Sequence, residues 1–132
     1  MPETIGPAAV DPVAVDPENA KLVVLARSSR ARTGSREGAA VRDTDGRTYA
    51  ASTVDLPSLQ LSALQAAVAA AVSSGVDGLE AAAVVTSAMA VEPAGLAAVR
   101  DLAASAPVFR ADTRGEVVEI VQAALGGGRP PS

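Results

Sequence analysis

The stretch from Pro57 to Gly75 carries the longest uninterrupted helical pattern in the chain, and it constrains the fold more than any other segment. Pro57 and Ser58 supply a start signal, and Gly75 supplies a stop. One apolar stripe recurs at helical spacing: Leu61, Leu64, Val68 and Val72. Most other positions are alanine, whose small side chain lets neighbouring backbones approach closely. We therefore predict a central helix over residues 57–75, packed between a sheet and a neighbouring subunit.

The remaining segments predict strands that alternate with helices. Asp16-Pro17 opens a helix that Gly34 ends, and Asp43-Thr44-Asp45-Gly46 supplies the turn of a hairpin. The predicted elements besides the central helix are a helix over 16–32, a hairpin over 37–52, a buried strand over 79–86, a helix over 93–104, a strand over 107–111 and a helix over 116–125. This order predicts an α/β protein, specifically a three-layer α/β/α sandwich with a mixed sheet.

The predicted folded domain covers residues 16–125. Residues 1–15 read as a flexible Pro-rich leader, and residues 126–132 read as a flexible Gly/Pro tail. The first fifteen residues lack the basic start and the apolar run of a signal peptide, so we expect a cytoplasmic protein. The central helix is shorter than the roughly 20 apolar residues that a membrane span needs.

The absence of two residue types excludes most site chemistry. The chain has no cysteine, so it can form neither disulfides nor thiolate metal sites, and it has no histidine, the commonest metal ligand and general base. Only 2% of its residues are aromatic, which leaves little for base stacking. The abundance of Arg over Lys, with much Ala, Gly, Val and Pro, is typical of a GC-rich genome, and we expect a bacterial source.

Residues 37–56, E-G-A-A-V-R-D-T-D-G-R-T-Y-A-A-S-T-V-D-L, resemble the hairpin of cytidine deaminases. In that family the next helix begins with Cys-Ala-Glu or His-Ala-Glu, and a later Pro-Cys-x-x-Cys opens the following helix. Three of those residues hold zinc, and the Glu shuttles protons. The resemblance implies the fold of that family for nearly all of the predicted domain.

The same resemblance places small or apolar residues at the functional positions. Ser62-Ala63-Leu64 falls on the Cys-Ala-Glu, and Pro93-Ala94-Gly95-Leu96-Ala97 falls on the Pro-Cys-x-x-Cys. The ligand positions therefore carry Ser62, Ala94 and Ala97, and the proton-shuttle position carries Leu64. The family's nucleoside contacts correspond to Ser35, Thr53 and Asp55. The resemblance implies a vestigial, filled pocket with no zinc and no other cofactor.

Two other readings of polar residues are weaker. Ser62 as a nucleophile would need a base that the chain lacks, so a helix cap is the better interpretation. Asp43, Asp45 and Asp55 could form an oxygen site for Mg²⁺, yet the spacing of the first two is also what a hairpin turn requires.

Charge is distributed unevenly along the chain. Residues 21–50 carry a net charge of +4, whereas the rest carries −8. The basic residues Arg27, Arg30, Arg32 and Arg36 could form an edge that binds a protein or RNA partner rather than DNA. The alternative is an ordinary solvated face.

These patterns lead to one main prediction of function and two alternatives. We expect a catalytically inactive, cytidine-deaminase-like protein that acts as a structural, oligomerising or partner-binding module. The alternatives are an active deaminase that hydrolyses cytidine or deoxycytidine, and a nucleoside- or RNA-binding module that uses the Arg27–Arg36 edge. With 48% hydrophobic residues and an alanine-rich helix, the chain should form a homo-oligomer, a tetramer before a dimer. Its contact would include Ala63, Ala66, Ala67, Ala70 and the helix from Pro93.

Overall fold

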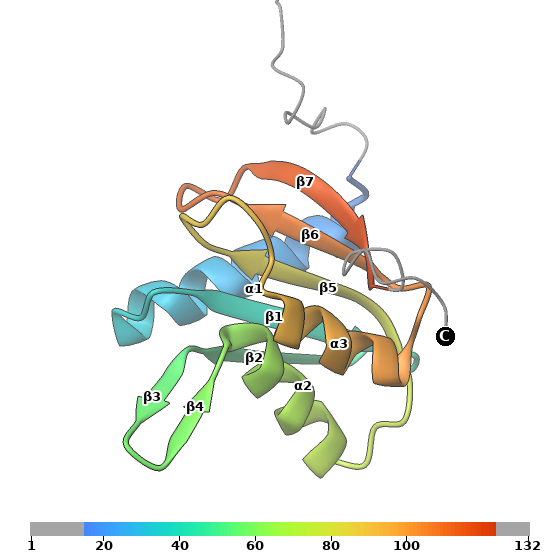
Figure 1. Ribbon diagram of the computed structural model, residues 1–132. Coiled ribbons are helices and arrows are strands. Elements are labelled where there is room, and N and C mark those ends of the chain that lie inside the picture. Colours follow the sequence, from blue (N-terminus) through green and yellow to red (C-terminus); the bar gives the residue numbers. More distant parts are fainter. Residues whose placement is uncertain (1–14, 124–132) are drawn as a thin grey trace, which may run out of the picture.

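In the part of the chain that the structure describes, three helices and a five-stranded mixed sheet form an α/β/α sandwich, which confirms the predicted fold class (Figure 1). The computed structural model describes residues 15–123, so the predicted leader and tail lie outside it, apart from residue 15. The elements are α1 (Pro17–Thr33), β1 (Gly38–Asp43), β2 (Thr48–Ser52), β3 (Val54–Leu56), β4 (Leu59–Leu61), α2 (Ala63–Ser73), β5 (Leu79–Val85), α3 (Pro93–Leu102), β6 (Pro107–Ala111) and β7 (Val117–Gln122).

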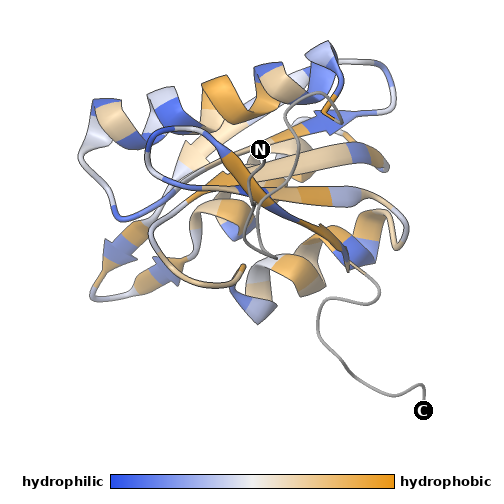
Figure 2. Ribbon diagram, turned by 90° about the horizontal axis from the view of Figure 1, so that it is seen from above, coloured by the Kyte–Doolittle hydropathy of each residue, from blue (hydrophilic) through white to orange (hydrophobic). Residues whose placement is uncertain are grey.

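The main sheet has the strand order β2-β1-β5-β6-β7. Only β5 and β6 run parallel, and α3 makes the crossover between them. The other neighbouring pairs are antiparallel. Helix α1 lies on one face of the sheet, and α2 and α3 lie on the other (Figure 2). In the described residues no helix is long and apolar enough to cross a bilayer.

Helix α1 has the end signals that the sequence predicts. The Asp16 side chain accepts a hydrogen bond from the backbone N–H of Asn19, Pro17 occupies the first turn, and Gly34 ends the helix with a φ of 66°. The contact of α1 with the sheet is unusually close at Gly38. A Cβ atom added there would lie 2.8 Å from the backbone nitrogen of Arg30, so only glycine fits.

The core has two halves made mainly of Ala and Val. One half lies between the sheet and α1 and includes Leu22, Ala26 and Phe109. The other lies between the sheet and the helices α2 and α3, and includes Leu64, Val68 and Val99. Because the side chains are small, each helix packs close to the strands it covers.

The central helix starts later than the sequence pattern predicts. Residues 54–61 form a separate two-stranded sheet, β3 paired with β4, and α2 begins at Ala63 with Ser62 as its N-cap. The stretches V-D-L and L-Q-L each alternate apolar and polar residues, and Pro57-Ser58 lies between them. This pattern is typical of a hairpin, so the predicted helix is wrong over residues 57–61. The predicted stripe is correspondingly wrong at its ends, because Leu61 belongs to β4 and Val72 is half exposed.

The buried side of α2 also corrects the predicted subunit contact. Ala63 and Ala67 are fully buried within the chain, so neither can reach a second subunit, whereas Ala66 and Ala70 remain partly exposed.

The predicted helix over residues 116–125 is wrong where the structure describes it. Residues 117–122, V-V-E-I-V-Q, form strand β7, which pairs with β6. Four of these six residues are β-branched, and β-branched side chains favour strands over helices. Residues 124 and 125 lie outside the described part of the chain.

Two hairpin turns have the same sequence pattern and the same geometry. Asp43-Thr44-Asp45-Gly46 joins β1 to β2, and Asp112-Thr113-Arg114-Gly115 joins β6 to β7. In each turn one oxygen of the first Asp accepts hydrogen bonds from the backbone N–H groups two and four residues later. The glycine adopts a φ of 87° in the first turn and 90° in the second. The turn interpretation of Asp43 and Asp45 is thereby confirmed.

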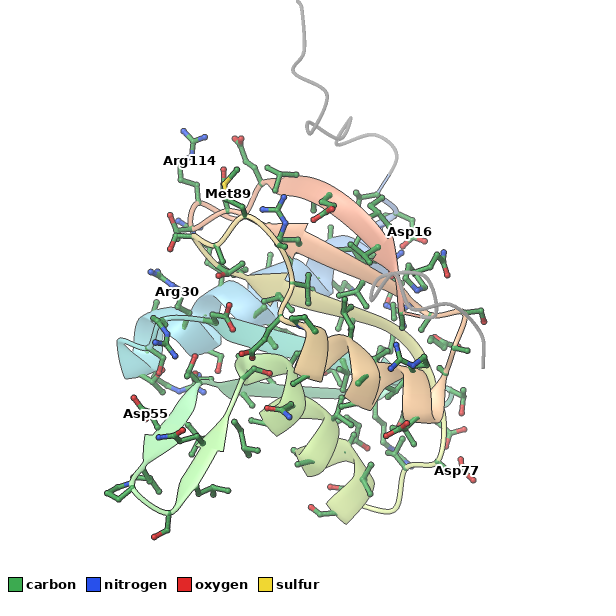
Figure 3. The ribbon with its side chains drawn as sticks, viewed as in Figure 1. Asp16, Arg30, Asp55, Asp77, Met89 and Arg114 are labelled. Atoms are coloured by element: carbon green, nitrogen blue, oxygen red, sulfur yellow. The ribbon has the colours of Figure 1, made fainter. Side chains whose placement is uncertain are left out.

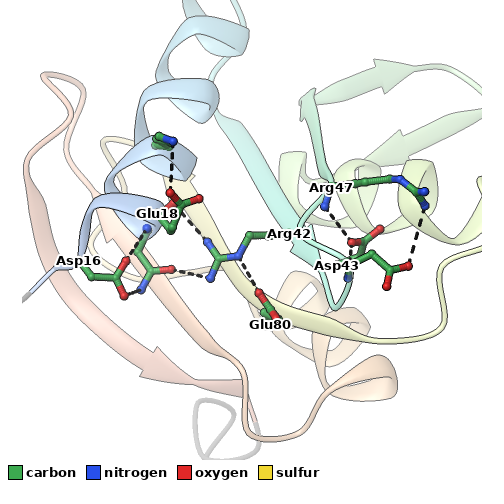
Figure 4. A network of polar contacts seen from close by, with 9 residues as sticks. Asp16, Glu18, Arg42, Asp43, Arg47 and Glu80 are labelled. Atoms are coloured by element: carbon green, nitrogen blue, oxygen red, sulfur yellow. Dashed lines mark hydrogen bonds and ion pairs between the residues drawn. The ribbon is translucent and has the colours of Figure 1, made fainter.

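Arg42 ties three elements together at one end of the sheet (Figure 4). Its guanidinium donates to the Glu80 carboxylate on β5 at 2.9 Å, to the Glu18 carbonyl at 3.2 Å and to the Asn19 side-chain oxygen at 3.0 Å. The side chain of Arg42 is only 13% exposed.

We expect Arg42→Ala to lower the free energy of unfolding by about 2 kcal/mol, because partly buried, charge-assisted hydrogen bonds are lost. Arg47→Ala is the control, since Arg47 is 72% exposed and meets Asp45 at 3.9 Å; it should change stability by less than about 0.5 kcal/mol. Urea denaturation of both variants measures the difference. Equal losses would contradict a special role for Arg42.

The pKa of the Asp43 carboxyl lies below its usual value. Burial raises this pKa, but hydrogen bonds from the Arg47 backbone, the Tyr49 hydroxyl and the Asp45 backbone together outweigh burial and lower it. A pKa that is lower in the folded than in the unfolded chain means that ionised Asp43 stabilises the fold. This stabilisation is complete above the unfolded pKa, near 4, and is lost as the pH falls through the folded value.

Asp43→Asn should therefore destabilise the protein at neutral pH, and its deficit relative to wild type should shrink as the pH falls below about 4. Denaturant unfolding across that range measures the deficit. Asp45→Asn alters an exposed carboxylate of the same turn and serves as the control. A deficit for Asp43→Asn that does not change with pH would show that its charge does not matter.

Candidate functional site: an open cleft beside two helix starts

A cleft of about 820 Å³ opens at the end of the molecule where α2 and α3 begin. Residues of four segments line it: the residues before β1, the junction of β2 and β3, the end of β4 with the start of α2, and the loop between β5 and α3. The residues predicted to fill the former metal site, Leu64, Ala94 and Ala97, do not line this cleft.

The start of α2 is held by a reciprocal cap. The Ser62 hydroxyl accepts a hydrogen bond from the Gln65 backbone N–H at 3.1 Å, and the Gln65 side chain accepts from the Ser62 N–H at 2.9 Å. Ser62 is 8% exposed and lines the cleft. Its predicted role as a helix cap is confirmed.

Leu64 packs against α3 and does not line the cleft. It is almost fully buried, and a Cβ atom added to Gly95 would lie 2.9 Å from the Cβ of Leu64. Ala94 is exposed and Ala97 is partly exposed, and neither lines the cleft. Leu64 of α2 therefore contacts the segment of α3 that contains Ala94 and Ala97. Ser62 caps the start of α2.

These four side chains do not fit a zinc ion. They offer one hydroxyl oxygen, which already accepts a backbone hydrogen bond, one isobutyl group and two methyl groups, whereas zinc takes sulfur, imidazole or carboxylate ligands. Within residues 15–123 no group of three or more acidic side chains is placed to hold any metal ion.

The three residues predicted for nucleoside contact separate into two groups. Thr53 and Asp55 line the cleft, and Asp55 projects from the β3–β4 hairpin (Figure 3). Ser35 does not line it, and its hydroxyl instead bonds to that of Thr33 at 2.8 Å. The Thr53 hydroxyl is used locally, because it accepts from the Glu37 backbone N–H at 3.1 Å.

Of the predicted basic edge, only Arg36 lines the cleft. Arg30 supports it, since its guanidinium donates to the Arg36 carbonyl at 3.1 Å. Arg27 and Arg32 are exposed on α1, and Arg27 lies beside the Gly115 turn.

Glu37 and Thr86 are functional candidates that the sequence patterns did not predict. Thr86 directly follows the buried strand β5 and is itself buried, and its hydroxyl donates to the Glu37 carboxylate at 2.8 Å. The available signals were a charged residue directly before the apolar run G-A-A-V and a threonine directly after L-E-A-A-A-V-V. Because β1 and β5 are antiparallel neighbours, β1 begins where β5 ends, and the polar side chains that flank the two strands can meet there.

Comparison with solved structures shows the fold. A cytidine deaminase from Burkholderia pseudomallei superposes with a TM-score of 0.69 and 22% sequence identity, over 79% of this chain and 91% of that chain. The cytidine deaminase from Mycobacterium leprae gives 0.62 and 18%, over 79% and 92%. A mutant cytidine deaminase from Mycobacterium tuberculosis gives 0.61 and 23%, over 79% and 89%.

Comparison of the sequence shows the family. No curated protein matches the chain significantly. A family model described as cytidine deaminase-like matches residues 15–115, which is well over half of the chain. The match spans the segment from α1 to the Gly115 turn and so includes every residue of the cleft. The chain therefore belongs to the cytidine deaminase-like family.

Proposed function

We propose that the protein is a catalytically inactive member of this family that serves as a structural, oligomerising or partner-binding module. The observation that carries the proposal is the contact of Leu64 with Gly95 at the start of α2. By resemblance, Leu64 stands where the family has its proton-shuttling Glu, and a leucine transfers no protons.

The missing ligand set supports the same conclusion. In the family, zinc lowers the pKa of its bound water to near 7, far below that of bulk water. Ser62, Ala94 and Ala97 cannot form that site, and no histidine or cysteine elsewhere in the chain can replace them. Attack of water on the cytosine ring would then proceed without an activated nucleophile and without a proton donor.

One observation favours ligand binding as a second candidate. The cleft remains open at about 820 Å³, and Arg36 lies at it. A nucleoside- or RNA-binding module that uses Arg27, Arg30, Arg32 and Arg36 would combine that cleft with the basic residues of α1.

We expect the purified protein to contain no stoichiometric zinc and to release no ammonia from cytidine or deoxycytidine above a buffer blank. Elemental analysis and a coupled ammonia assay measure these quantities, with an active cytidine deaminase as the positive control. Leu64→Glu should remain inactive, because it restores the carboxylate without the metal. One zinc ion per chain, or measurable turnover by the wild type, would refute the proposal.

We also propose that the protein assembles through α2. The helix contains no charged residue, and its outer side presents Ala66, Ala69, Ala70 and Val72. The neighbouring hairpin adds Leu56 and Leu59, which lie opposite each other and are 55% and 49% exposed. An uncharged apolar surface of this kind is suited to burial in a symmetric contact.

Light scattering at micromolar concentration should therefore give a tetramer, or failing that a dimer, of the 13.0 kDa chain. Ala69→Arg places a charge in the proposed contact and should shift the assembly toward monomer. Ala31→Arg changes an exposed alanine of α1 in the same way and should leave the assembly intact. A monomeric wild type would remove this part of the proposal.

A further inference from the structure

We propose that strand β7 pairs with β7 of a second copy of this chain, so that the main sheet continues from one subunit into the next. β7 is the last strand in the order β2-β1-β5-β6-β7, and Figure 1 shows it at the outer edge of the sheet. Among the described strands only β6 pairs with it. The inference rests on the proposed assembly, to which it adds a second contact.

The edge of β7 lacks most of the features that keep sheet edges from pairing. An edge strand exposes unpaired N–H and C=O groups, which natural proteins protect with Lys, Pro, unpaired charges or bulges. β7 has the sequence V-V-E-I-V-Q, without Lys or Pro, and Ile120 at its centre is 41% exposed. Its one irregularity lies near its start, where Val118 has no partner in the register with β6. Residues 119–122 therefore form a regular, mostly apolar edge.

The single charge on β7 is neutralised within the subunit. The Glu119 carboxylate accepts a hydrogen bond from the Arg110 guanidinium on β6 at 2.7 Å, and the Arg110 side chain is only 10% exposed. Like charges that face each other across two strands are destabilising. Because Arg110 already pairs with Glu119, the edge presents little charge that would repel a second strand.

Helix α3 leaves part of β7 uncovered. A hollow of about 420 Å³ lies between β7 and the start of α3, and its lining includes Val91, Leu96 and Val121. An uncovered apolar surface beside an unpaired edge is typical of an interaction site. If a two-fold axis perpendicular to the sheet relates two copies, both α3 helices lie on the same face, and the two hollows adjoin along the paired strands.

Two-fold symmetry restricts the register of this pairing. Residues directly opposite each other in antiparallel strands point to the same face, so the axis must pass through a residue. An axis at Glu119 would place two carboxylates opposite each other. An axis at Ile120 places Ile120 opposite its own counterpart, Glu119 opposite Val121, and Val118 opposite Gln122. An axis nearer either end would pair fewer residues, so the strand favours the axis at Ile120.

The proposed tetramer requires a second contact of this kind. One two-fold contact joins only two copies, whereas a tetramer with dihedral symmetry needs two different contacts. The proposed contact through α2 is one of them. Helix α2 and strand β7 lie at opposite ends of the molecule, so both can be occupied at once (Figure 1).

Disulfide trapping tests the register, because the chain has no cysteine of its own. Opposite Cα atoms in antiparallel strands are about 4.5–5.5 Å apart, within the range of about 4.4–6.8 Å that a disulfide spans. Ile120→Cys should therefore give a linked pair of twice 13.0 kDa after mild oxidation, visible on a non-reducing gel. Gln122→Cys is the matched control. Its counterpart would lie four residues further along, about 13 Å away, and should not be linked.

Light scattering of charged variants tests the contact without a cross-link. Ile120→Lys places two ammonium groups opposite each other and should convert the tetramer to a dimer that is held through α2. Ala69→Arg should leave a dimer that is held through β7, and the two changes together should give a monomer. Val24→Lys is the matched control, because Val24 is a β-branched residue of α1 that is 61% exposed. It should remain a tetramer.

The inference is overturned if Ile120→Cys forms no linked pair, if Gln122→Cys is linked as readily, or if Ile120→Lys assembles as wild type does. An assembly that only Ala69→Arg disrupts would refute the β7 contact and support the α2 contact. An assembly that only Ile120→Lys disrupts would do the reverse. A monomeric wild type would refute both contacts. Zinc content and ammonia release, which test the proposed inactivity, are independent of all these outcomes.

Discussion

The close approach of α1 to strand β1 is the contact on which the rest of the structure depends. With one Phe and one Tyr in 132 residues, the chain cannot fill a wide gap between helix and sheet, so the helix must lie directly on the strand. Gly38 allows this, because any side chain there would collide with the backbone of α1. The same contact fixes the start of β1, and therefore the place of the neighbouring Glu37 beside the cleft.

Most of the fold could be predicted because its signals are local. Asp16-Pro17 and Gly34 mark the ends of α1, and the uninterrupted apolar run of β5 marks a central strand. The predicted helix is wrong over residues 57–61 and over residues 117–122, where the spacing of apolar residues fits a helix but the neighbouring turn residues favour a hairpin. Asp43-Thr44-Asp45-Gly46 predicts a hairpin turn. Residues 112–115 share its Asp-Thr-x-Gly pattern and precede β-branched residues, so they mark a second hairpin and not the start of a helix.

The candidate site was predictable only in part, because a site is formed by residues distant in sequence. The resemblance points to Ser62, Thr53 and Asp55, and all three line the cleft. The pairing of Glu37 with Thr86 joins residues 49 positions apart and depends on β1 lying next to β5. No periodicity within either segment reveals it.

The contact between Leu64 and Gly95 also restricts what can stand at position 64. A carboxylate there would place a charge in the apolar contact between α2 and α3, where burial disfavours it. A larger residue at position 95 would meet the Leu64 side chain. The two positions can therefore change only together, or with a shift of one helix against the other.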